Sequence, residues 1–275
     1  MRPHKAGIRF LVAAVAVVLC VSACSRVAFM KTNPSRKGYD PVTEPVVVHD
    51  SDASRGRETA RNSVMESQQK LADGDLAGAE KAAKQAAKAD PKSADAYTML
   101  GAVADRLGHA ADAGANYERA ATLEPTGARL NNYGAWLCSN GRAGDSLAWF
   151  DKALQDPSYG SAASAMANAG KCALDAGQHV RADQSLRAAL QLDPASAVAL
   201  GALARMQFDA GRYMEARAFS ERRLSAAPAT ADALQLASQI EDKLGDSAAA
   251  ARYGRRLREE FPGAAQGNAG GSKAP

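Results

Sequence analysis

Apolar and polar positions recur with a helical period through most of the chain, and proline interrupts the pattern at regular intervals. Between residues 94 and 125, for example, Tyr97 and Leu100 lie three residues apart, which places them on one face of a helix. Three of the five intervals between successive prolines are 34 residues long, and these prolines are Pro91, Pro125, Pro157, Pro194, Pro228 and Pro262. Proline lacks the backbone N–H that a continuing helix needs, so each interval predicts helices that end near its proline.

One glycine near the middle of each interval predicts a turn between two helices. These glycines are Gly74, Gly108, Gly141, Gly177, Gly211 and Gly245. Glycine is favoured where a helix ends in a left-handed residue and the chain reverses. The pattern therefore predicts six helix pairs, at about residues 60–93, 94–126, 127–159, 163–196, 197–230 and 231–262. A coiled coil is the competing helical interpretation, but no apolar heptad is sustained.

A period of 34 residues is the length of the tetratricopeptide repeat. The unit that starts at Ala94 matches that repeat pattern throughout, with Tyr97, Leu100, Gly101, Ala113, Tyr117, Ala120 and Pro125. The units that start at Ala60, Ala197 and Ala231 match more loosely, and weak terminal repeats are expected because they cap the array. We predict an all-α fold over residues 58–262, a right-handed α-solenoid of about six tetratricopeptide helix pairs.

Residues 1–23 predict an export signal. Three cations and no acid flank an unbroken apolar run of 12 residues at 10–21. That run is too short for a membrane-spanning helix of about 20 residues but suits a signal peptide. The segment Val21-Ser22-Ala23-Cys24 resembles a bacterial lipobox, which implies cleavage before Cys24, diacylglycerol on its sulfur and acylation of its new amino terminus. Ser25 at the next position then favours sorting to the outer membrane. An ordinary signal peptide with a fortuitous cysteine is the alternative.

The segments on either side of the repeats lack a helical pattern. Residues 24–57 contain three prolines and mixed charges, so we expect a disordered, lipid-anchored linker. A flexible chain of this length spans roughly 30–35 Å, enough to hold the repeats away from a lipid surface. Residues 263–275 are rich in glycine and alanine and predict a disordered tail.

The composition supports helices and leaves the mature chain almost neutral. Alanine, the strongest helix former, accounts for 63 of 275 residues, whereas aromatic residues make up 5%. The formal charge is +4, but cleavage before Cys24 removes three cations and leaves 31 basic and 30 acidic residues. We therefore expect no nucleic-acid partner, because nucleic-acid binding needs a concentrated basic surface.

No constellation of catalytic residues is recognisable. The sequence has no HExxH, GxSxG, GxGxxG or Walker-type motif. His109 and His179 fall at the predicted turns of separate repeats, where we interpret them as solvated turn residues. We expect a protein that is not an enzyme, with no cofactor, no metal and no small-molecule substrate.

Two cysteines remain in the predicted repeats, Cys138 and Cys172. Both fall on the first helices of adjacent repeats, which stack side by side, so contact between them is feasible. An exported protein meets an oxidising compartment. A disulfide is possible here, and two buried free thiols are the alternative.

The first helices of the repeats predict a concave surface that binds a partner. Positions 2, 5, 9, 12 and 13 of such helices line the inner wall of a curled array. The candidate residues are Val64, Leu71, Thr98, Ala102, Asn131, Ala135, Lys171, Leu174, Val198, Arg205 and Phe208. They are small, mixed and partly apolar, which suits an extended strand or a helix with apolar anchors.

The lipobox, the linker and the repeats together resemble one family, the type IV pilus biogenesis and stability lipoproteins of the PilW/PilF pilotin type. The segment LNNYGAWLCSNGR at residues 130–142 carries much of this resemblance, as do residues 168–172 and 250–262. Some members carry cysteine at both of the positions named above, which supports the disulfide.

The resemblance implies an outer-membrane lipoprotein on the periplasmic face that helps the type IV pilus secretin to localise and assemble. It would act by binding its protein partner, without turnover, and the lipid anchor would be its contact with the membrane. Two alternatives remain open: a lipoprotein adaptor of tight-adherence pili, and a regulator of peptidoglycan enzymes.

Overall fold

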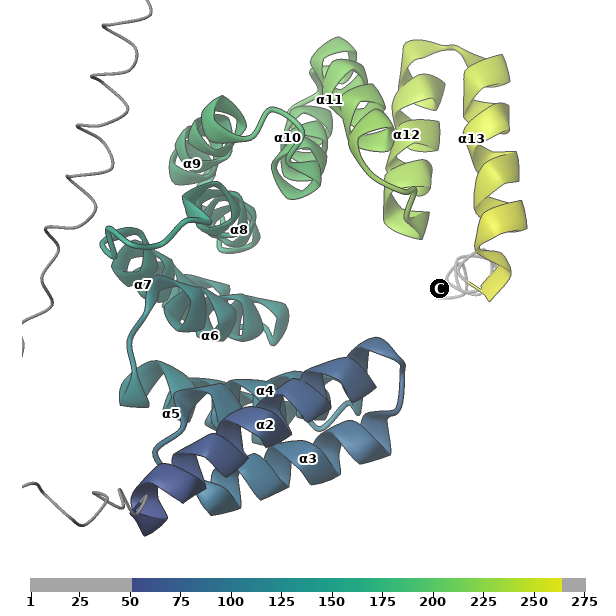
Figure 1. Ribbon diagram of the computed structural model, residues 1–275. Coiled ribbons are helices and arrows are strands. Elements are labelled where there is room, and N and C mark those ends of the chain that lie inside the picture. The colour runs from purple at the N-terminus through teal and green to yellow at the C-terminus, as the bar shows by residue number, and fades with distance from the viewer. Residues whose placement is uncertain (1–50, 264–275) are drawn as a thin grey trace, which may run out of the picture. The chain divides into compact units, whose positions relative to one another are not determined.

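The computed structural model of the protein describes residues 51–263, which form twelve α-helices and no strand (Figure 1). The helices are α2 (Asp52–Ala72), α3 (Leu76–Ala89), α4 (Ala94–Arg106), α5 (Ala110–Leu123), α6 (Gly127–Ser139), α7 (Ala143–Leu154), α8 (Ala162–Asp175), α9 (His179–Leu192), α10 (Ala197–Asp209), α11 (Tyr213–Ala226), α12 (Ala231–Leu244) and α13 (Ser247–Glu260). They pack in six consecutive pairs, so the predicted all-α repeat solenoid is confirmed.

Each pair turns at one glycine. Within residues 51–263, the residues with positive φ are the six predicted turn glycines, at 73–81°. The amide of the following residue then bonds back into the first helix, as when Arg142 N–H donates to Leu137 at 2.9 Å. The same turn recurs in every repeat, which keeps the two helices of each pair close together.

Small residues let the two helices of a pair approach closely. A Cβ added at Gly134 in α6 would lie 3.0 Å from the Phe150 ring of α7, and one added at Gly170 in α8 would lie 2.5 Å from Leu186 of α9. Phe150 and Leu186 are both fully buried. The core is therefore built from one large side chain facing a glycine or alanine, which accounts for the high alanine content.

The first helix begins earlier than the sequence indicated. Residues 52–57 were predicted to belong to the linker, but they form the first turns of α2. Ser51 caps this helix, since its hydroxyl accepts the Ser54 amide hydrogen bond at 3.1 Å. Gly56 lets α2 lie against the end of α3, because a Cβ there would sit 2.7 Å from the Ala89 carbonyl oxygen. The predictions for residues 1–50 and 264–275 lie outside the described residues.

The connection after α7 is longer than the others because it folds over the start of α6. Asp156 accepts a hydrogen bond from the Gly127 amide at 2.7 Å and so caps a helix that has no side-chain cap of its own. The ring of Tyr159 occupies the place of a side chain at Gly127, where a Cβ would lie 2.4 Å from it. The loop after α7 therefore contacts the start of α6 and links the two helices of the third repeat at that end.

Asp156 gives this loop a pH dependence. Its pKa is lowered because the Ser158 hydroxyl and the Gly127 amide donate hydrogen bonds to the carboxylate. A pKa below the unfolded value stabilises the fold above about pH 4, and that contribution is lost as pH falls through the folded-state pKa. We expect Asp156→Asn to lower the urea midpoint at pH 7, with a difference that narrows below about pH 4. A difference independent of pH would contradict this role of the carboxylate.

A disulfide joins adjacent repeats. Cys138 on α6 and Cys172 on α8 are bonded, with their Cα atoms 5.8 Å apart. Both cysteines lie in one buried cluster with Leu203 of α10 and Phe150 of α7. The covalent link thus crosses the middle of the array, next to the helices that form the site described below.

Candidate protein-binding groove

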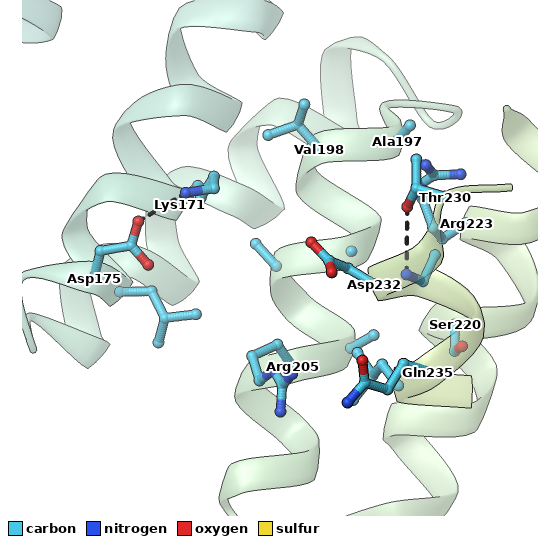
Figure 2. A pocket seen from close by; sticks show the side chains of 16 residues that line it. Lys171, Asp175, Ala197, Val198, Arg205, Ser220, Arg223, Thr230, Asp232 and Gln235 are labelled. Carbon is cyan, nitrogen blue, oxygen red and sulfur yellow. Dashed lines mark hydrogen bonds and ion pairs between the residues drawn. The ribbon is translucent and has the colours of Figure 1, made fainter. Parts of the chain in front are cut away.

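A cavity of about 440 Å³ lies between the first helices of the last three repeats, α8, α10 and α12 (Figure 2). Residues of α11 complete it. Its lining residues are Lys171, Leu174, Asp175, Ala197, Val198, Gly201, Ala202, Ala204, Arg205, Ser220, Arg223, Thr230, Asp232, Ala233, Gln235 and Leu236. Because three repeats contribute, the stacking of the helix pairs creates the cavity, and no single repeat could form it.

Apolar side chains from three helices line part of the cavity. Val198 of α10 is 42% exposed, and it is among the most exposed large apolar residues of the described chain. Leu174 of α8 is half-buried and also packs on the core, while Leu236 of α12 is buried. Exposed apolar surface in a concave site gains free energy when a partner covers it.

Most charged groups at the cavity already have partners. Lys171 lies 2.7 Å from Asp175, one helical turn away on α8. Arg205 pairs with Asp209 at 3.7 Å along α10. Arg223 donates to the backbone carbonyls of Ala227 and Pro228, at 3.3 and 3.2 Å, and so holds the connection from α11 to α12.

Asp232 differs from these groups. It stands in the first turn of α12, where a negative charge is favourable. Within residues 51–263, no side chain pairs with its carboxylate. Figure 2 shows this carboxylate pointing away from α12 into the cavity. An acidic group that faces open space beside apolar surface is suited to meeting a basic group of a partner.

Gly201 is one of the α10 residues that line the cavity. A Cβ added there would meet only Arg223 Cδ, at 3.9 Å, which is an ordinary contact. Glycine in a helix interior is less stable than alanine by about 0.5–1 kcal/mol. Packing within the described chain therefore does not require glycine at this position.

This observation leads to a stability prediction. We expect Gly201→Ala to raise the free energy of unfolding by about 0.5–1 kcal/mol in urea denaturation. The matched control is Gly170→Ala, where the added Cβ would lie 2.5 Å from Leu186 Cγ. Overpacking at that site should lower stability by about 1–3 kcal/mol. Equal losses in the two variants would contradict the assignment of open space to Gly201.

Four of the residues predicted for the concave surface line the cavity: Lys171, Leu174, Val198 and Arg205. Six others lie outside it and are half-buried, namely Leu71, Thr98, Ala102, Asn131, Ala135 and Phe208. Asn131 accepts a hydrogen bond from Asn168 at 3.1 Å and so links α6 to α8. The part of the predicted surface that lines this cavity therefore comes from α8 and α10.

The prediction for Val64 was wrong. Val64 is 7% exposed and packs in a core cluster with Ala83 of α3 and Met99 of α4. Among the buried residues of α2, only Val64 has an aliphatic side chain larger than that of alanine. Burying that side chain stabilises the first repeat by about 1.5 kcal/mol or more, so it faces inward.

Asp232, Gln235 and Arg223 line the cavity but were not among the residues predicted from the sequence. Asp232 and Gln235 occupy positions 2 and 5 of the last repeat, the same positions that supplied candidates in earlier repeats. Extending the pattern by one repeat would have found them. Arg223 lies on a second helix, so no rule about first helices could identify it.

Comparison with known proteins identifies the repeats. Tetratricopeptide-repeat family profiles match residues 94–126 and 173–240. The fold is a tetratricopeptide-repeat solenoid. Such arrays expose extended concave surfaces that bind protein partners. Comparison of the sequence with curated proteins gives no significant match.

Three solved structures resemble this tetratricopeptide solenoid. The crystal structure of PilW, described as a widely conserved type IV pilus biogenesis factor, is similar with a TM-score of 0.69 and 28% identity, over 77% of this chain and 99% of that one. PilF of Pseudomonas aeruginosa is similar with a TM-score of 0.66 and 22% identity, over 78% and 98%. A tetratricopeptide protein of Parabacteroides merdae has a TM-score of 0.56 and 19% identity, over 74% and 80%.

Two further properties bear on the site. Within residues 51–263, no helix is both long and apolar enough to cross a membrane. In the same part of the chain, no group of three or more His, Cys, Asp or Glu residues is placed to hold a metal ion. The cavity is open, lined by apolar and charged groups from several helices, and suited to binding a peptide segment.

Proposed function

We propose that this protein is an outer-membrane lipoprotein that acts as a pilotin, an assembly scaffold for the secretin of the type IV pilus. The similarity to PilW, at 28% identity over 99% of that chain, is the observation that carries the proposal. A scaffold with this role acts by binding, and the groove between α8, α10 and α12 is a surface through which it can bind.

The amino-terminal sequence supports the proposed location. The lipobox at residues 21–24 places a cysteine where lipid is attached, and residues 25–50 separate that cysteine from the first helix. Two or more acyl chains hold a protein stably at a bilayer, whereas one chain binds only marginally. The repeats would then reach secretin subunits at the periplasmic face of the outer membrane.

Deletion of the gene tests the proposal. We expect loss of twitching motility together with loss of heat-resistant secretin multimers on a denaturing gel, and restoration of both by the full chain. Both readouts are needed, since a motility defect alone could arise elsewhere in the pilus. Normal piliation and normal secretin multimers in the deletion strain would contradict the proposal. Copurification of the protein with peptidoglycan enzymes instead of the secretin would also contradict it.

A further inference from the structure

The two helices of each pair meet along a seam, and the second, third and fourth repeats fill this seam with one large side chain. That side chain belongs to the second helix and lies against a glycine of the first helix. The pairs are Gly101 with Tyr117, Gly134 with Phe150, and Gly170 with Leu186. In each pair the large residue supplies the atoms that lie nearest to a Cβ added at the glycine, so the seam is closed by direct packing.

The first and sixth repeats close the seam with a hydrogen bond instead. The Ser67 hydroxyl of α2 donates to the Ala79 carbonyl of α3 at 2.8 Å. The Ser238 hydroxyl of α12 donates to the Ala250 carbonyl of α13 at 3.0 Å. These two serines occupy the repeat position that is glycine in the second, third and fourth repeats. A small residue of the first helix therefore contacts the second helix directly in each of these five repeats.

The fifth repeat has neither arrangement. Ala204 of α10 and Ser220 of α11 lie one repeat of 34 residues after Gly170 and Leu186. Both side chains are small, and Ala204 has no hydroxyl that could bond to α11. The Ser220 hydroxyl makes no hydrogen bond to any of residues 51–263, although Ser220 is only 5% exposed. A buried hydroxyl without a partner is unfavourable, so this seam is incomplete in the protein alone.

The incomplete seam borders the cavity between α8, α10 and α12. Ala204 and Ser220, the latter labelled in Figure 2, both line this cavity of about 440 Å³. Arg223 lies about one turn beyond Ser220, but its guanidinium donates to the carbonyls of Ala227 and Pro228, and its side chain borders the cavity. An apolar cavity of about 150 Å³ is large enough to bind benzene. The space beside the seam can therefore hold a large side chain of another molecule.

We propose that a partner protein inserts one large apolar side chain, aromatic or branched aliphatic, against Ala204 and Ser220 and so completes the seam of the fifth repeat. The kind of side chain follows from the preceding repeats, where Tyr117, Phe150 and Leu186 occupy the equivalent place. Val198, which is 42% exposed in the same cavity, offers apolar contact to the residues next to the inserted one. The inference rests on the proposed function as a protein-binding scaffold and adds the residue by which the bound segment is held.

The variant Ser220→Leu tests whether the seam has room, because it supplies the residue that the fourth repeat has at this place. We expect its urea midpoint to equal or exceed that of the wild type, since leucine fills space and removes a buried unpaired hydroxyl. The matched control is Ser225→Leu, an exposed serine of the same helix that does not line this cavity. A lower midpoint for Ser220→Leu than for the control would show that the seam has no room and would overturn the inference.

Selection from a random-peptide library tests the chemistry of the bound segment. The full chain, purified in detergent, is used as wild type, Ser220→Leu and Ser225→Leu. We expect the wild type and the control to enrich peptides that share phenylalanine, tyrosine, leucine or isoleucine at one position, and Ser220→Leu not to enrich them. Enrichment of no motif, or of the same motif by all three proteins, would contradict the proposal.

Fluorescence anisotropy with the selected peptide tests whether its shared residue and Ser220 meet. Ser220→Leu in the protein, or alanine at the shared position of the peptide, is expected to weaken binding at least about tenfold. The two changes together should weaken binding little more than either alone, because both remove the same contact. Fully additive losses would place the shared residue elsewhere and overturn the inference.

A crosslinking measurement in cells identifies the occupant. A photoreactive amino acid at Val198 is expected to crosslink to a different protein, whereas crosslinks only within the same chain or to a second copy of it would overturn the inference. If the deletion strain loses secretin multimers while the Ser220→Leu strain keeps them, the inference fails and the proposed function stands. Normal multimers in the deletion strain would remove the proposed function, while the peptide selection would still decide what the fifth repeat binds.

Discussion

Replacing Cys138 and Cys172 together by serine is expected to lower the free energy of unfolding by about 3–4 kcal/mol. The disulfide closes a loop of 34 residues between α6 and α8, and closing a loop of that length removes chain entropy mainly from the unfolded state. The loss is large because repeat arrays are held together by contacts between neighbours alone. Breaking the link between the third and fourth repeats weakens the array near its middle.

Urea denaturation of the oxidised wild type, the reduced wild type and the double variant measures this contribution. The reduced wild type and the double variant should unfold at similar urea concentrations, both below that of the oxidised protein. Thiol labelling of the unreduced protein is the control and should detect neither Cys138 nor Cys172. Equal stability of all three samples, or two reactive thiols in the unreduced protein, would contradict the structural role of the bond.

Replacing Cys24 by alanine is expected to remove essentially all of the protein from the outer-membrane fraction. The predicted anchor consists of acyl chains on this residue, each stabilising attachment by about 0.8 kcal/mol per buried CH₂. No described helix could replace it by spanning the membrane. The described helices begin at Asp52, well after Cys24 in the sequence, so we expect the circular dichroism spectrum and the urea midpoint to remain unchanged.

The matched control for this experiment is Cys20→Ala. Cys20 lies in the apolar run of the same signal segment, four residues before Cys24. That variant should fractionate with the outer membrane like the wild type. Outer-membrane fractionation that persists in the Cys24→Ala variant would refute lipidation at this residue.

The arrangement of the helices was predictable because its causes are local and repeated. Proline ends the second helix of a pair, and glycine ends the first helix and forms the turn that follows it. The period visible in the sequence is therefore also the period of the fold. The start of α2 was not predictable in the same way. Its first turns carry no proline and no repeat signal, and they are set by the Ser51 cap and by the contact of Gly56 with Ala89.

The candidate site was predictable only in part. Lys171, Leu174 and Val198 were found because they occupy concave positions of the repeat, which the sequence pattern defines. The cavity itself depends on how three repeats stack, and on Arg223 of a second helix that holds the connection into α12. Such contacts between repeats produce no regular spacing of residues that could be recognised in the sequence. The position of Val64 likewise depends on which side of α2 meets α3 and α4.

The most direct test of the central claim is whether the protein binds the secretin in its native membrane. After crosslinking in living cells, the tagged full chain is isolated from solubilised outer membranes and the secretin is detected with a specific antibody. We expect the wild-type chain to retain secretin and the Cys24→Ala variant, expressed at the same level, to retain much less. Absence of secretin from the wild-type isolate, while secretin is present in the same membranes, would contradict it.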